Sequence, residues 1–70
     1  MNVNGKKLGH NIKKLRQYQR LSQEELSRKA GLKLTNVTKL EGGFNSNPTL
    51  QTLINLANVL SGGSIDRLFY

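Results

Sequence analysis

Apolar residues recur at intervals of three and four along most of the chain, which is the spacing of amphipathic helices. Leu8, Ile12 and Leu15 follow this spacing within a helix predicted over residues 5–19. A wider apolar face follows in a helix predicted to begin near Pro48 or Thr49, and it contains Leu50, Leu53, Ile54, Ala57 and Leu60. The pattern predicts five helices and no strands.

Residues 21–43 carry the clearest local signals of helix boundaries. Ser22 can cap a helix, and Glu25 three residues later completes a capping box. Gly31 follows where this helix must end, because glycine reaches the left-handed conformation at little cost. A second helix fits residues 34–41, with Val37 and Leu40 facing inward. Two short helices joined by a tight glycine turn predict a helix-turn-helix over residues 22–42.

The remaining boundaries complete a single domain over residues 1–70. Asn47 or Thr49 can cap the fourth helix, and Ser64 can cap a last short helix over residues 65–69. Residues 1–7 are expected to form a basic N-terminal arm. We find no repeat, linker or low-complexity segment.

Several segments together resemble a known family. In order they are IKKLRQYQRLSQEELSRKAG, VTKLEGG, NPTLQTLINLANVL and SIDRLF. The chain resembles the phage-repressor and Cro-type, or XRE-like, helix-turn-helix domains over about residues 8–69. The resemblance implies an all-α, compact five-helix lambda-repressor-like fold, in which the second and third helices form the helix-turn-helix.

The charge of the chain favours a polyanionic partner. Eleven Lys and Arg residues against four acids give a net charge of +7, and all but Arg67 precede residue 40. A basic surface that serves only solubility is the alternative. No apolar run approaches the ~20 residues of a membrane span, and no signal peptide is evident. We therefore expect a cytoplasmic protein without a membrane partner.

The resemblance implies that the third helix enters the major groove of double-stranded DNA. Its base-reading positions are then Leu34, Thr35, Thr38 and Lys39. Expected contacts to phosphate or to DNA register are Gln23, Lys33, Asn36, Lys13, Lys14 and Asn45. The alternatives are a solvated helix face for Thr38 and Lys39, an inward position for Leu34, and a turn-forming role for Asn45. Lys33 stands at the usual cap position, so a later helix start with Thr35 as the cap is also open.

Two structural roles also follow from the resemblance. Arg16 and Glu41 match positions that form a partly buried ion pair between the first helix and the end of the third. Relatives often pair through the region of their last helix, which favours a homodimer. Its surface would consist of Leu56, Val59, Ile65, Leu68 and Phe69. The same residues could instead close the core of a small domain.

Composition argues against catalysis and metal binding. The chain has one histidine, His10, and no cysteine, so it lacks the usual ligands of a metal site and a nucleophile–base pair. We expect no cofactor, no metal and no enzyme. The sequence predicts a bacterial or phage transcriptional regulator, most simply a repressor. The competing hypotheses are an antitoxin whose partner is a toxin, and the DNA-binding part of a longer repressor with a further C-terminal domain. RNA binding is less favoured because the chain has only four aromatic residues.

Overall fold

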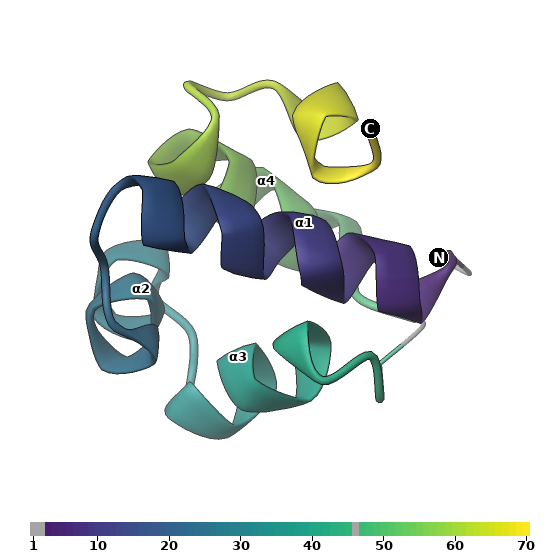
Figure 1. Cartoon of the computed structure of the whole chain (residues 1–70), viewed down its shortest axis with the longest axis horizontal. Coiled ribbons are helices and arrows are strands. Elements are labelled where there is room, and N and C mark those ends of the chain that lie inside the picture. Colours follow the sequence, from purple (N-terminus) through teal and green to yellow (C-terminus); the bar gives the residue numbers. More distant parts are fainter. Residues whose placement is uncertain (1–2, 46) are drawn as a thin grey trace.

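The computed structural model describes residues 3–45 and 47–70, and it contains four α-helices and one short 3₁₀ helix. They are α1 (Gly5–Tyr18), α2 (Gln23–Ala30), α3 (Leu34–Glu41), α4 (Leu50–Leu60) and η1 (Ile65–Leu68). In Figure 1, α1 crosses the middle of the molecule, with α3 on one side of it and η1 on the other. The described residues include no strand, which agrees with the predicted all-α class.

The predicted fifth α-helix is wrong. Residues 65–68 form a 3₁₀ turn, closed by the backbone N–H of Phe69, which donates to the carbonyl oxygen of Asp66 at 3.0 Å. The side chain of Ser64 does not cap this turn, so its first N–H groups lack the support that an α-helix start usually receives. Tertiary contacts hold the turn instead: Leu68 is buried, and its carbonyl oxygen accepts a hydrogen bond from Nδ2 of Asn11 at 3.0 Å.

The capping signals of α2 are confirmed. The hydroxyl of Ser22 accepts from the N–H of Glu25 at 3.0 Å, and Oε1 of Glu25 accepts from the N–H of Ser22 at 2.9 Å. The hydrogen bonds from Ser22 hold the pKa of the Glu25 carboxyl below its usual value. Gly31 ends the helix with φ at 66°, in the left-handed region.

The other helix starts follow the expectations with small differences. α1 begins at Gly5 and ends at Tyr18, one residue before its predicted end. The expected arm over residues 1–7 therefore overlaps the first turn of α1, and its residues 1–2 lie outside the described residues. α3 begins at Leu34 after Lys33, which makes no side-chain cap, so the later start at Thr35 is wrong. Thr49 caps α4 by accepting from the N–H of Thr52 at 3.1 Å.

The core differs from the expectation along α4. Its members are Leu8, Ile12, Leu26, Ala30, Val37, Leu40, Leu53, Leu56, Ala57, Leu60 and Leu68. The dimer surface predicted from the sequence is therefore wrong for Leu56 and Leu68, which are fully buried within the chain because α4 packs on α2, α1 and η1. Val59, Ile65 and Phe69 are partly buried against the same core. Leu50, which the sequence placed on the inner face, is 59% exposed.

A glycine inside α1 sets the distance between α1 and α3. A Cβ atom on Gly9 would collide with the carbonyl oxygen of Leu40 and would lie 2.9 Å from that of Glu41. Only a residue without a side chain allows the two helices to approach so closely. Gly9 therefore fixes the position of the C-terminal end of α3 against α1.

Candidate nucleic-acid interface

α3 presents one face to the core and the other to solvent. Val37 and Leu40 are buried, with 0% and 1% of their surface exposed. Thr35, Thr38 and Lys39 are exposed on the opposite side, as the helical period of 3.6 residues requires. Leu34 is 40% exposed, although leucine is an apolar residue. The four residues expected to read bases are therefore all accessible.

The polar groups on this face differ in what they can offer a ligand. The hydroxyl of Thr38 donates to the carbonyl oxygen of Thr35 at 2.9 Å, so Thr38 presents a methyl group and oxygen lone pairs outward. Among the described residues, the only ion pair is Arg16–Glu41. The ammonium group of Lys39 therefore has no acidic partner in this part of the chain. These groups match the hydrogen-bonding and methyl features of base edges in the major groove.

The start of α2 lies beside the start of α3. A shallow depression of about 430 Å³ is lined by Arg16, Ser22, Gln23, Glu24 and Leu34. Nε2 of Gln23 donates to Oε1 of Glu41 at 3.2 Å, so this side chain is held in place by a neighbouring helix. The first residues of α2 therefore lie next to Leu34 at the start of α3.

The ion pair that the resemblance implied is present and is more extensive than expected. Nε and Nη2 of Arg16 donate to Oε2 and Oε1 of Glu41 at 2.6 and 2.9 Å, and Nη1 donates to the carbonyl oxygen of Leu21 at 2.7 Å. The two side chains are only 11% and 3% exposed. The hydrogen bond to Glu41 raises the pKa of Arg16 above its ordinary value. This network joins α1, the start of α2 and the end of α3.

Lys13 and Lys14 of α1 lie on different flanks of the helix. Gly9 and Arg16 face α3, and Lys13 lies four residues after the first and three before the second, so it belongs to the same flank. Lys14 instead lines an open groove between α1 and η1. The structure therefore places Lys14 away from α3, on a different flank of α1 from Lys13.

The other residues expected to contact phosphate differ in how exposed they are. Lys33 and Asn36 are exposed at the start of α3. Asn45 is partly buried, and its Oδ1 accepts from the backbone N–H of Asn47 at 3.0 Å. This is the local hydrogen bond of an Asx turn. Asn45 therefore forms a turn, which was the alternative to a phosphate contact at this position.

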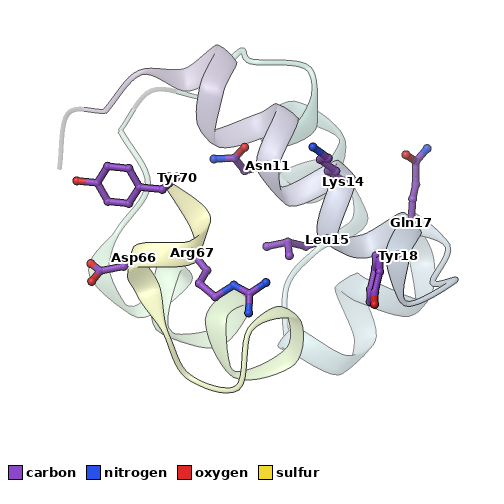
Figure 2. A pocket seen from close by; sticks show the side chains of 8 residues that line it. All are labelled: Asn11, Lys14, Leu15, Gln17, Tyr18, Asp66, Arg67 and Tyr70. Carbon is purple, nitrogen blue, oxygen red and sulfur yellow. The ribbon is translucent and has the colours of Figure 1, made fainter.

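The groove between α1 and η1 has a volume of about 930 Å³. Figure 2 shows Tyr18 and Tyr70 at its two ends, with the guanidinium of Arg67 between them. Its lining residues are Asn11, Lys14, Leu15, Gln17, Tyr18, Asp66, Arg67 and Tyr70. Because η1 and α3 lie on opposite sides of α1 in Figure 1, this groove is separate from the exposed face of α3.

Other kinds of site have little support in the described part of the chain. No group of three or more histidine, cysteine or acidic residues that could hold a metal ion is found among residues 3–45 and 47–70. The same residues form no helix that is long and apolar enough to cross a membrane.

A family model and two similar solved structures agree on the family of this chain. The helix-turn-helix family model matches residues 12–68. The restriction-modification controller protein C.AhdI from Aeromonas hydrophila is 32% identical, with a TM-score of 0.85 over 93% of this chain and 96% of that chain. SinR, the master regulator for biofilm formation, solved in complex with DNA, is 30% identical, with a TM-score of 0.83 over 90% of this chain and 98% of that chain. No curated protein matches the chain.

A similar fold also occurs within a larger enzyme. The hydroxypropylphosphonic acid epoxidase from S. wedmorenis is 24% identical, with a TM-score of 0.84. The comparison covers 100% of this chain but 36% of that chain. At this identity the likeness concerns the fold alone.

Proposed function

The chain belongs to the XRE-like helix-turn-helix family of Cro and repressor type, and from this premise we propose that it reads a specific sequence in double-stranded DNA. The observation that carries the proposal is the exposed face of α3, with Leu34, Thr35, Thr38 and Lys39 accessible together. The net charge of +7 supports an anionic partner.

In the proposed mechanism, α3 lies in the major groove. Lys39 donates to the O6 and N7 atoms of guanine, and Leu34 packs on a thymine methyl. Thr35 offers its hydroxyl, and Thr38 offers its methyl group and lone pairs. Contacts of Lys33, Asn36 and Lys13 with phosphate set the register of the protein on the duplex without specifying sequence. The start of α2, with Gln23 held by Glu41, contacts the phosphates on the other side of the groove.

We further propose that the protein binds as a homodimer and acts as a repressor. α3 has eight residues, so it is about 12 Å long and reads few base pairs. Two copies on half-sites about one helical turn apart, ~34 Å, would double the contacts. Occupying such a site near a promoter would block transcription. A bacterial or phage regulator of this kind works in the cytoplasm, by binding rather than by catalysis.

Selection of bound duplexes from a random DNA pool, at about physiological salt, tests the proposal. We expect enrichment of an inverted repeat with half-site centres about one turn apart. A single enriched half-site would contradict dimeric binding, and the chain would then resemble the DNA-binding part of a longer repressor. No enrichment would contradict sequence reading and favour a protein partner such as a toxin.

A further inference from the structure

The loop after α3 exposes an aromatic ring to solvent. Phe44 is 86% exposed, although its ring is wholly apolar. Residues 42–47 contain no lysine or arginine. A loop beside the proposed reading helix therefore carries an exposed apolar side chain and no cation.

The ring lies on the same face of α3 as the proposed reading residues. Gly42 follows Thr38 by four residues and Thr35 by seven, so its Cα lies on that outward face. A Cβ atom on Gly42 would lie 2.8 Å from both Cδ2 and Cε2 of Phe44. The ring of Phe44 therefore covers Gly42 and extends the exposed face of α3 at its C-terminal end.

The backbone of the loop places the ring there. The N–H of Phe44 donates to the carbonyl oxygen of Lys39 at 3.0 Å, and Gly43 turns the chain with φ at 78°. Gly42 leaves the space that the ring occupies, because any side chain at this position would meet it. The pose of Phe44 thus depends on two glycines and one backbone hydrogen bond.

We propose that Phe44 packs on deoxyribose rings at the edge of the major groove, as a further DNA contact of the proposed reading face. Seven residues separate Thr35 from Gly42, or about 10 Å along the helix axis. The groove is about 12 Å wide, so with α3 inclined across the groove, a ring at Gly42 reaches the backbone when Thr35 lies over the bases. Sugar carbons offer an apolar surface at that edge, and burying the ring against them removes apolar area from water.

The inference rests on the proposed function, and measuring affinity for the selected duplex and for a random duplex tests the two separately. Phe44→Ala should weaken both affinities by roughly tenfold, as expected for burial of one side of an aromatic ring. The slope of log affinity against log salt should stay unchanged, because no phosphate charge is involved. By contrast, Lys13→Ala should lower that slope by about 1.

Gly42→Ala provides a second variant that keeps the phenylalanine. Gly42 has φ at −76° and ψ at −6°, which alanine adopts without strain, so the fold should be retained. The added Cβ displaces the ring, and DNA affinity should fall in the same way as in Phe44→Ala. Tyr18→Ala is the matched control, because Tyr18 is 88% exposed but lines the groove on the other flank of α1. Thermal melting checks that each variant is folded.

The outcomes separate the two claims. Failure of the unaltered protein to bind any duplex would overturn the proposed function. Normal binding by Phe44→Ala would overturn the role of Phe44 and leave the proposed function intact. A loss confined to the selected duplex would also overturn the inference, because the ring would then read a base rather than the backbone. Equal losses for Phe44→Ala and Tyr18→Ala would point to a general effect of exposed aromatic residues and contradict it as well.

Discussion

Replacing Glu41 with glutamine should strongly destabilise the protein, although the two side chains have nearly the same size and shape. Glu41 accepts hydrogen bonds from Nε and Nη2 of Arg16 and from Nε2 of Gln23. A glutamine side chain has one oxygen acceptor, and its NH₂ group would face donors. The Arg16 side chain is only 11% exposed, so its charge would remain poorly solvated and without a counter-ion.

The magnitude follows from the burial of both partners. Removing one member of a buried, hydrogen-bonded ion pair costs about 3–5 kcal/mol. A chain of 70 residues has a total stability of about 4–10 kcal/mol. Because each kcal/mol moves the midpoint of a small domain by about 4–8 °C, the melting temperature of Glu41→Gln should fall by roughly 12–40 °C.

Thermal and urea denaturation followed by circular dichroism would measure the effect. Glu24→Gln is the matched control, since Glu24 is an exposed acid at the start of α2, and its effect should stay within about 0.5 kcal/mol. The double variant Arg16→Met with Glu41→Gln should lose less than the sum of the two single variants, because no charge is left unpaired. Similar free energies of unfolding for Glu41→Gln and Glu24→Gln would refute the reasoning.

Three further predictions follow from particular contacts. Gly9→Ala should destabilise the protein by several kcal/mol, on the order of an overpacked core site, because its Cβ meets the carbonyl oxygens of Leu40 and Glu41; urea denaturation showing unchanged stability would contradict the close approach of α1 and α3. Because the pKa of Glu25 is lowered in the folded protein, the stabilisation that its carboxylate provides is complete above its unfolded pKa, about 4.3. That stabilisation is lost as pH falls through the folded pKa. Unfolding measured from pH 6 to pH 3 should therefore show a steeper loss for the unaltered protein than for Glu25→Gln, and identical acid limbs would argue against the capping box as the cause. Finally, Lys13→Ala should weaken binding to all duplexes, whereas Lys14→Ala should change it little, since Lys14 lines the groove beside η1; equal losses in a binding titration would contradict the assignment of the two flanks.

Much of the helical layout could be predicted from the sequence because its signals are local. Ser22, Glu25 and Gly31 act on their own helix ends, and each takes the predicted role. The inner positions of α3, Val37 and Leu40, also follow from helical spacing alone. These features need no knowledge of distant parts of the chain.

The wrong predictions concern packing between elements that are distant in sequence. Leu50 was predicted to face inward and Leu56 outward, but Leu50 is exposed and Leu56 is buried. The side of α4 that is buried depends on where α2 and η1 pack against it. Gly9 gave no sequence signal, since its role is visible only when α3 lies across α1. The hydrogen bond from Gln23 to Glu41 likewise joins residues 18 positions apart. For the interface, the resemblance supplied the residues of α3, but only the three-dimensional arrangement separated Lys13 from Lys14.

The central claim is that the outward face of α3 reads DNA sequence, and repeating the duplex selection with Lys39→Ala tests it most directly. We expect the variant to enrich the same site with the preference relaxed at one or two base pairs, at a cost on the order of 1–3 kcal/mol on the original site. Arg67→Ala removes the same charge on η1, on the opposite side of α1, and should select the unaltered site. An unchanged site preference for Lys39→Ala, with equal losses on selected and random DNA, would contradict the account.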